Sequence, residues 1–231
     1  VHFVTNRCNA RCSFCFIDFE DENIFNDELS IQEIDILTKS LGRSLVNVNL
    51  TGGEPFARKD LVEVARKYCK NTTIQSIYIT TNGSLPDRIE KFTKIITKEF
   101  PYITLTISIS IDGLEKDHDQ IRKISGLYQN CIKSYNLIRN LPRVEPVVNI
   151  TVSHDNYTIL SELYNHLTVR NSIKSIKATI VRDEGVYKIP DKHRKQILDG
   201  YVWLTNKIIE DSKKNQLDTY NQNTIQGRMH L

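Results

Sequence analysis

The chain has 231 residues and a formal net charge of +3, enough for one substantial domain with its own core. The charge is nearly balanced, and the sequence contains no run of basic residues interleaved with aromatic ones. Both features argue against nucleic acid as a partner. No apolar stretch approaches the ~20 residues of a membrane span, and the first residues do not show the charged-then-apolar pattern of a signal leader. We therefore expect a soluble, cytoplasmic protein with no membrane or nucleic-acid partner.

Short β-type segments alternate with longer helical patterns along the chain. The expected strands cover residues 1–6, 46–52, 76–83, 104–113, 146–153 and 175–182. The expected helices cover residues 30–41, 59–70, 85–100, 127–141, 155–170 and 191–214. Repetition of strand and helix in this way predicts an α/β fold in which parallel strands are joined by right-handed crossovers.

Several predicted strands have one polar face and one apolar face. In "TLTISISI" (104–111), threonine and serine alternate with leucine and isoleucine, and residues 46–51, 76–82 and 149–153 follow the same pattern. A parallel sheet covered on both faces normally shows continuous apolar strands, so these polar faces should line a wet or ligand-filled cavity. We predict a partial, TIM-like (β/α)6 barrel with outer helices. An open sheet with one solvent-exposed face is the alternative.

Three cysteines follow the first predicted strand in "CNARCSFC", at Cys8, Cys12 and Cys15. In a reducing compartment, so tight a triplet indicates a metal site rather than disulfides. Zinc would require a fourth Cys or His, and no second C-x-x-C pair follows downstream. A [4Fe–4S] cluster held by three thiolates would instead leave one iron open to a ligand. Cys69 and Cys131 lie alone in helical patterns, and we expect them to serve packing.

The cysteine motif resembles the signature of the radical S-adenosylmethionine (SAM) enzymes. The motifs "TGGEP", "TTNG" and "SIDG", which end the second, third and fourth predicted strands, also match that family. The segment "SIDGLEKDHDQIRKISG" is most similar to the branch of SPASM-type and anaerobic sulfatase-maturing enzymes. The resemblance covers nearly the whole chain. It implies that the three cysteines hold a [4Fe–4S] cluster whose open iron binds SAM.

The resemblance also implies a set of residues around SAM: Phe14, Gly52, Gly53, Glu54, Thr80, Asn82, Ser110, Arg122 and Asn149. A glycine has no Cβ, so the GGE segment can bring its backbone close to a ligand. Glu54 would place negative charge near the SAM ammonium and sulfonium, and a helix-capping contact is its alternative role. Arg122 suits the SAM carboxylate because a guanidinium binds carboxylates bidentately and keeps its charge. His118 and Asp119 are expected to orient their loop.

By resemblance, the reaction is the reductive cleavage of SAM to methionine and a 5′-deoxyadenosyl radical, which abstracts hydrogen from a substrate. This first step requires no catalytic residue beyond the cluster and the SAM site. It does require a one-electron donor such as a flavodoxin or a ferredoxin. A peptide or protein is the first interpretation of the substrate, and a small molecule of cofactor biosynthesis is the alternative.

We expect residues 1–215 to form the radical SAM core and residues 216–231 to form an exit segment toward a further C-terminal domain. Two non-catalytic hypotheses stay open. One is a zinc or iron–sulfur knuckle that stabilises a binding domain, which would give the GGEP, TTNG and SIDG motifs no role. The other is a domain that binds SAM without radical chemistry.

Overall fold

The computed structural model describes residues 1–25 and 28–214. The predicted exit segment, residues 216–231, lies outside this part, so the expected domain boundary stays a prediction. Within the described residues, every helix is too short or too polar to cross a membrane. The described residues divide into two compact units. The first unit comprises residues 1–11, 17–25, 28–109 and 130–146, and the second comprises residues 12–16, 110–129 and 147–214.

Among residues 1–25 and 28–214, six strands form one sheet in the order β1-β2-β3-β4-β5-β6. The strands are β1 (His2–Thr5), β2 (Asn47–Gly52), β3 (Ser76–Thr81), β4 (Thr104–Ser110), β5 (Val144–Val152) and β6 (Ile176–Ile180). Strand β2 pairs in parallel with β1 and β3, β3 pairs in parallel with β4, and β5 pairs in parallel with β6. The predicted α/β fold with six parallel strands is therefore confirmed.

Every predicted helix is present, and the structure adds one that we did not predict. The helices are α1 (Ile31–Leu41), α2 (Leu61–Asn71), α3 (Pro86–Glu99), α4 (Glu115–Arg122), α5 (Leu127–Ile138), α6 (Leu160–Asn165) and α7 (Asp191–Lys213). The described residues also form the 3₁₀ turns η1 (Glu22–Phe25), η2 (Gly42–Ser44) and η3 (Pro55–Ala57), and the π-helical η4 (His166–Arg170) continues α6. The added helix is α4. Its eight residues, "EKDHDQIR", are too few and too polar to show a clear apolar periodicity.

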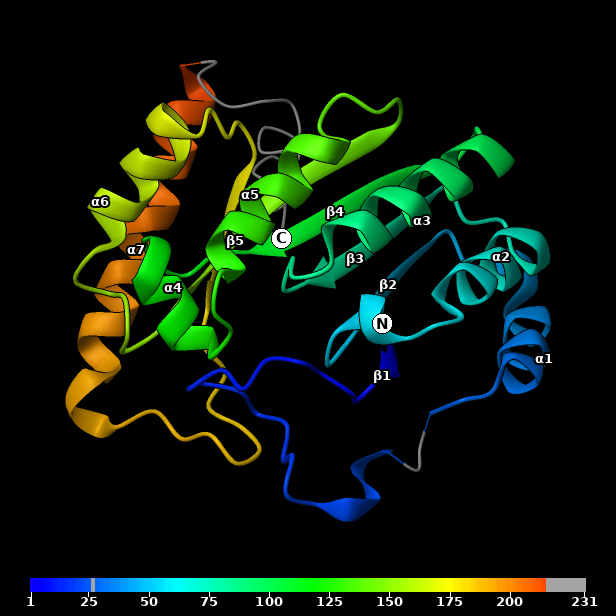
Figure 1. The fold of residues 1–231 in the computed structure, drawn as a ribbon, viewed down its shortest axis with the longest axis horizontal. Helices are drawn as coiled ribbons and strands as arrows, with labels where there is room; N and C mark the ends of the chain where they lie inside the picture. Colours follow the sequence, from blue (N-terminus) through cyan, green and yellow to red (C-terminus); the bar gives the residue numbers. More distant parts are fainter. Residues whose placement is uncertain (26–27, 215–231) are drawn as a thin grey trace. The chain divides into compact units, whose positions relative to one another are not determined.

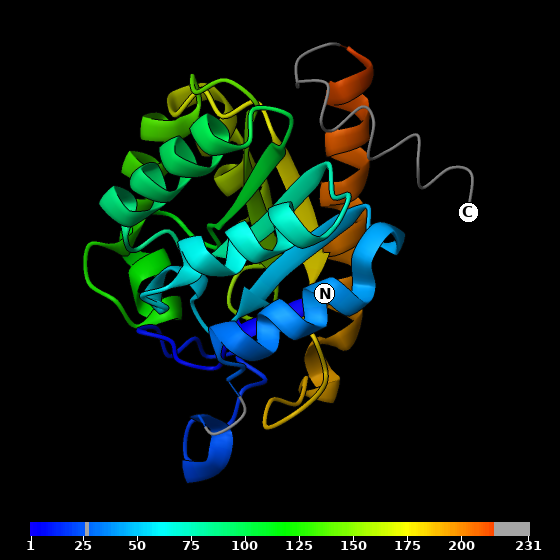
Figure 2. The same cartoon turned by 90° about the vertical axis from the view of Figure 1, so that its right-hand side faces the viewer.

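Local sequence signals explain where the helices of the first unit begin. The Ser30 hydroxyl accepts a hydrogen bond from the Glu33 amide at 3.2 Å, and the Glu33 carboxylate accepts one from the Ser30 amide at 2.8 Å. This capping box satisfies two amides that would otherwise lack partners at the start of α1. Helix α3 begins at Pro86, where the missing N–H of proline costs nothing. Helices α1, α2 and α3 lie side by side (Figures 1 and 2).

The polar face of the first unit contains buried atoms that need partners. Asn49 on β2 and Ser108 on β4 belong to the predicted polar face, and Ser108 is fully buried. Asn49 Oδ1 and Ser108 Oγ have no hydrogen-bond partner among the described residues. Because buried polar atoms are normally paired, this supports water or a bound ligand over that face, as expected for a polar interior.

In the second unit, the polar face of β5 is hydrogen-bonded to its neighbour β6. The Thr179 hydroxyl on β6 donates to Asn149 Oδ1 at 2.8 Å, and Asn149 Nδ2 donates to the Thr151 hydroxyl at 3.3 Å. The opposite face of β5 carries Ile150 and Val152, which are fully buried. Helix α7 packs against β6 and α6 (Figure 1). The alternation of polar and apolar residues along β5 therefore places a packed apolar face opposite a hydrogen-bonded polar face.

Candidate functional site

The three cysteines of the motif lie in the loop after β1, and none of them forms a disulfide. Each is partly exposed, whereas Cys69 and Cys131 are buried. Burial raises the pKa of the Cys69 thiol to about 12, which keeps it protonated and inert. Cys8 belongs to the first compact unit, and Cys12 and Cys15 belong to the second. We therefore describe the residues around Cys8 with the first unit and the residues around Cys12 with the second unit.

In the first unit, the two glycines of the GGE motif lie against the backbone of the cysteine loop. A Cβ on Gly52 would lie 2.0 Å from the Thr5 carbonyl oxygen, and Gly52 has a φ of +135°. A Cβ on Gly53 would lie 2.3 Å from the Arg7 carbonyl oxygen. The Gly53 amide donates to Thr5 O and the Glu54 amide to Arg7 O, both at 2.8 Å. The close approach we expected toward a ligand is therefore made, in these contacts, toward the chain that leads into Cys8.

Glu54 connects the end of β2 to the end of β3. Its side chain is fully buried. One carboxylate oxygen accepts from the Thr81 hydroxyl at 2.7 Å and from the Phe56 amide at 3.0 Å, and the other accepts from the Asn82 amide at 2.6 Å. The capping role that we gave as the alternative for Glu54 is therefore seen at η3. Thr81 was missed by the sequence reasoning, although its place in "TTNG" on the apolar face was a signal.

Asn82 carries this network to the first cysteine of the motif. Its Nδ2 donates to Asn9 Oδ1 at 2.8 Å and lies 3.9 Å from Cys8 Sγ. The Ala10 amide donates to the same sulfur at 3.3 Å. The Asn82 carbonyl accepts from the buried Cys131 thiol at 3.1 Å, so Cys131 helps to hold the backbone at Asn82 in place. Two neutral N–H donors thus face the Cys8 sulfur.

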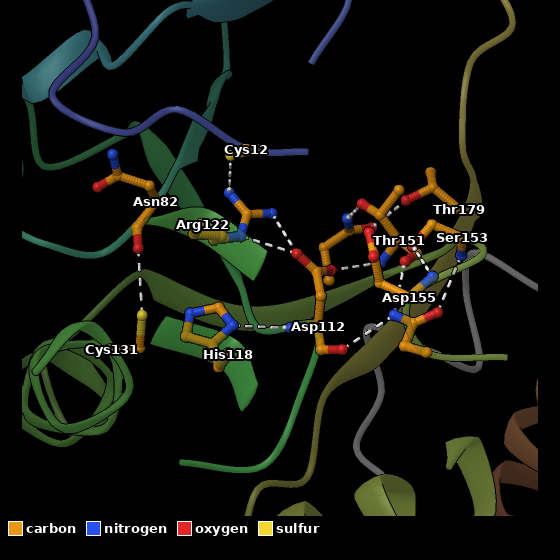
Figure 3. Close-up of polar contacts among 12 residues, drawn as sticks. Cys12, Asn82, Asp112, His118, Arg122, Cys131, Thr151, Ser153, Asp155 and Thr179 are labelled. Atoms are coloured by element: carbon orange, nitrogen blue, oxygen red, sulfur yellow. Dashed lines mark hydrogen bonds and ion pairs between the residues drawn. The ribbon is translucent and has the colours of Figure 1, made fainter. Parts of the chain in front are cut away.

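In the second unit, Arg122 joins the end of β4 to the cysteine loop (Figure 3). Its Nε and Nη2 bond Asp112 Oδ2 at 2.7 and 2.6 Å, and its Nη1 lies 3.8 Å from Cys12 Sγ. The guanidinium also lies 5.7 Å from the centre of the Phe14 ring, a cation–π contact. Burial raises the pKa of the Cys12 thiol, and the Arg122 charge opposes that shift. A fixed positive charge therefore faces the second cysteine.

Asp112 and His118 hold this arrangement in place. Asp112 Oδ1 accepts from the Thr151 amide at 2.8 Å, and the Asp112 amide donates to His118 Nδ1 at 3.0 Å (Figure 3). Burial and the Arg122 charge lower the pKa of His118 well below its usual value, so the ring is neutral. Since Nδ1 accepts this hydrogen bond, the ring proton is on Nε2. His118 therefore orients the turn after β4, as expected.

Two further predicted residues, Thr80 and Ser110, lie on strands β3 and β4, and Asp119 lies in α4. Thr80 pairs in register with Ser108, and Ser110 is buried at the end of β4. Asp119 accepts from the Gly126 and Tyr128 amides at 2.5 and 2.8 Å and so fixes the start of α5. The roles of Thr80 and Ser110 toward SAM stay predictions.

The donor set fits the expected cluster. Inside the described part of the chain, no three His, Cys, Asp or Glu side chains meet around one point as a single metal ion would require. A cluster has a separate iron for each thiolate, so its ligands need not meet at one point. N–H donors directed at Cys8 and Cys12 sulfur favour thiolates and are among the features that tune iron–sulfur potentials. Cys8, Cys12 and Cys15 are thus suited to a [4Fe–4S] cluster.

Comparisons with known proteins agree with these motifs. GTP 3′,8-cyclase of Clostridium perfringens is 27% identical over 219 residues, covering 88% of this chain and 65% of that protein. Fe-coproporphyrin III synthase of Methanosarcina barkeri is 33% identical over 131 residues, covering 56% of this chain and 31% of that protein. The chain thus spans less than two thirds of the length of either relative. Neither relative singles out the SPASM-type or sulfatase-maturing branch.

A solved structure of a histidine-tagged protein, described as "anSMEcpe with bound AdoMet", matches with a TM-score of 0.68 and 19% identity. The match covers 93% of this chain and 60% of that one, and at this identity it shows the fold alone. The family model for the radical SAM superfamily matches residues 3–164. Members of this family are enzymes whose cofactors are a [4Fe–4S] cluster and SAM. This chain belongs to the radical SAM superfamily.

Proposed function

We propose that this chain is the catalytic core of a radical SAM enzyme that acts on a small molecule of cofactor biosynthesis. The observation that carries the proposal is the family match over residues 3–164, which includes all three cysteines and every predicted SAM-site residue. The substrate class follows the relatives, which are named for a nucleotide and for a porphyrin. Our first interpretation, a peptide substrate, has less support than the small-molecule alternative.

In this proposal Cys8, Cys12 and Cys15 bind the cluster. When bound, the cluster and SAM supply an electron and a 5′-deoxyadenosyl radical that abstracts hydrogen from the substrate. The remaining predicted residues bind SAM: Phe14, Gly52, Gly53, Glu54, Thr80, Asn82, Ser110, Arg122 and Asn149. We also propose a one-electron donor such as a flavodoxin or a ferredoxin, because the reaction is reductive.

The chain's own residues have separable tasks in this reaction. Arg122, which Asp112 holds in one orientation, keeps a positive charge beside Cys12 and can attract the SAM carboxylate. Asn82 donates a neutral hydrogen bond toward Cys8. The Phe14 ring contributes a cation–π contact to the Arg122 guanidinium. His118, being neutral, adds no second positive charge near the cysteine loop.

A peptide substrate is the second candidate. It rests on the similarity of residues 110–126 to the SPASM-type branch. In this structure three residues of that segment, Asp112, His118 and Arg122, contact one another and the cysteine loop. Contacts of this kind support the SAM site and are neutral about the substrate.

The proposed function is tested by anaerobic reconstitution with iron and sulfide, followed by dithionite and SAM, with an assay for 5′-deoxyadenosine. We expect 5′-deoxyadenosine from the wild type and from Cys131→Ala, and none above background from Cys12→Ala. A wild type without 5′-deoxyadenosine, or a Cys12→Ala variant with an undiminished yield, would refute the mechanism. Porphyrin and nucleotide substrates can then be compared with peptides by their effect on the yield.

A further inference from the structure

The first compact unit contains a pocket outside the predicted SAM site. Its volume is ≈ 250 Å³, and it lies where the loop after the GGE motif meets α2 and α3. Apolar side chains form part of its wall: Phe56, Leu61, Val62 and Phe92. The rest of the wall is cationic: Arg58, Lys59, Arg88 and Lys91. Within the described part of the chain, no acidic side chain lines this pocket, which we call the basic pocket.

The two arginines of the basic pocket are held by backbone carbonyls. Arg58 donates to Val4 O at 2.6 Å and to Leu29 O at 2.8 Å, and it pairs with Asp60 at 2.8 Å. Arg88 donates to Phe56 O at 2.8 Å. Arg88 is thus held against the loop that follows Glu54, and Arg58, which belongs to that loop, is held against the backbone at Val4 and Leu29.

Three of the four cations, unlike Arg58, have no carboxylate partner among the described residues and are available to a binding protein. Lys59, Arg88 and Lys91 are all exposed, and none of them pairs with a carboxylate anywhere in residues 1–25 and 28–214. Asp87, next to Arg88 in the sequence, pairs instead with Lys133. Three uncompensated positive charges at one exposed pocket form a local positive field, which attracts a negatively charged partner.

A bonded route leads from the wall of the basic pocket to a predicted cluster ligand. The Phe56 amide donates to Glu54 Oε1 at 3.0 Å, and Glu54 Oε2 accepts from the Asn82 amide at 2.6 Å. Asn82 Nδ2 then lies 3.9 Å from Cys8 Sγ. All of these residues belong to the same compact unit, so the route does not depend on how the two units are placed.

We propose that the basic pocket is the docking and electron-entry site for an acidic one-electron carrier protein. The inference rests on the proposed function, because a reductive reaction needs such a donor. Charge complementarity selects an acidic protein: the exposed lysines and Arg88 stand at the rim, where a protein surface can reach them. The carrier would lose one electron and pass it to the cluster that Cys8, Cys12 and Cys15 would hold, with no proton or other co-reactant consumed.

The proposal is tested with the double variant Lys59→Glu/Lys91→Glu. Lys70→Glu/Lys98→Glu is the matched control, because it makes the same change of net charge near the ends of α2 and α3, away from the pocket. The donor is an acidic flavodoxin reduced enzymatically. At low salt we expect the pocket variant to form 5′-deoxyadenosine about tenfold more slowly with this donor, because reversed charges remove electrostatic steering. With dithionite, which needs no docking site, both variants should match the wild type.

Binding of the flavodoxin to the chain, followed by calorimetry, gives a second readout that does not depend on the reaction. We expect weaker binding for the pocket variant alone, and a smaller dependence on salt than the wild type shows. Equal rates and equal binding for the two double variants would overturn the proposal. So would an equal loss with dithionite, or saturable binding of inorganic pyrophosphate that the pocket variant loses while its flavodoxin binding is unchanged.

These outcomes separate the docking site from the proposed function. A wild type that forms no 5′-deoxyadenosine with dithionite refutes the function, whatever the donor does. In that case the binding measurement still decides whether the basic pocket recognises an acidic protein. Melting temperatures of both variants within a few degrees of the wild type would show that the fold is intact.

Discussion

The thiols of Cys8 and Cys12 are held in two different electrostatic settings. Around Cys8, the donors are neutral N–H groups from Asn82 and Ala10. The carboxylate of Glu54, which anchors that network, accepts three hydrogen bonds from neutral groups. Around Cys12, the neighbour is a guanidinium that is paired with a buried carboxylate.

The two units therefore hold their motif residues in place by different means. In the first unit, position is set by short backbone contacts and by a carboxylate bonded to neutral donors. In the second unit, position is set by the ion pair of Arg122 and Asp112, in which the side chains are 8% and 0% exposed. Losing one member of a buried ion pair costs more than losing one neutral hydrogen bond. The two networks should therefore respond very differently to substitution.

The largest effect is expected for Arg122→Met. This change removes the countercharge of Asp112 and leaves a buried carboxylate without compensation, so the free energy of unfolding should fall by about 3–5 kcal/mol. Denaturant unfolding measures this quantity. The double variant Asp112→Asn/Arg122→Met should recover part of the loss, because it buries no charge. A loss below about 1 kcal/mol in the single variant would contradict the ion pair as described.

The next effect is a loss of stability in mild acid. Burial lowers the pKa of His118 well below 6.5, and burial lowers the pKa of His2 to about 4. Both rings are neutral in the folded state but take up a proton below pH 6.5 when unfolded. The contribution of His118 to stability is therefore fully present above that pH and falls by about 1.4 kcal/mol per pH unit below it.

Unfolding curves from pH 8 to pH 5 measure this dependence. His118→Asn is the control, because an amide oxygen can replace the Nδ1 acceptor and does not titrate. The variant should show a shallower loss in acid than the wild type. Identical pH profiles for the two proteins would contradict a buried neutral His118.

In the first unit, Glu54→Gln should cost about 1–3 kcal/mol of unfolding free energy. The amide presents an N–H₂ group to a donor that was bonded to a carboxylate oxygen, so one buried hydrogen bond is lost. Thr81→Val removes a hydroxyl that donates to Glu54 and also accepts from the Gly83 amide at 3.1 Å, so it should cost a similar amount, about 1–3 kcal/mol. Thermal or denaturant unfolding of the two variants measures both costs. A cost below about 0.5 kcal/mol for Glu54→Gln would mean that Glu54 is not the centre of this network.

The smallest expected effect on stability is that of Asn82→Ala, about 1 kcal/mol, because its side chain donates to Asn9 and Cys8 and accepts from the Ser84 amide in a partly exposed setting. Asn82→Asp sharpens the comparison because it places a carboxylate beside the Cys8 sulfur. Repulsion between like charges should then disfavour the Cys8 thiolate and slow its alkylation by iodoacetamide relative to Cys12. If the ratio of the Cys8 alkylation rate to the Cys12 alkylation rate is the same in the wild type and in Asn82→Asp, Asn82 does not act on Cys8.

The sequence predicted the elements well because alternation and helical periodicity are local signals. Each of the six strands and every predicted helix is found, and the cysteine motif lies in a loop after β1. The helix α4 was missed because its eight polar residues carry no clear period. Without α4 in the prediction, the contact of Arg122 with Asp112, ten positions earlier, could not be predicted either.

The partners of the motif residues were harder to predict because they lie far away in the sequence. Gly52 and Gly53 were expected to approach a ligand, and their closest neighbours are the carbonyls of Thr5 and Arg7. Glu54 accepts from Thr81, 27 positions later. A single sequence reports which residues are unusual, but it does not report which distant backbone they touch.

The most direct test of the account is the iron and acid-labile sulfide content of five single cysteine variants after anaerobic reconstitution. We predict about four of each per chain for the wild type, Cys69→Ser and Cys131→Ser, as a [4Fe–4S] cluster requires. We predict a marked loss for Cys8→Ser, Cys12→Ser and Cys15→Ser. A full complement in any of these three variants, or a comparable loss in Cys131→Ser with its fold intact, would contradict a cluster held by the three cysteines of the loop after β1.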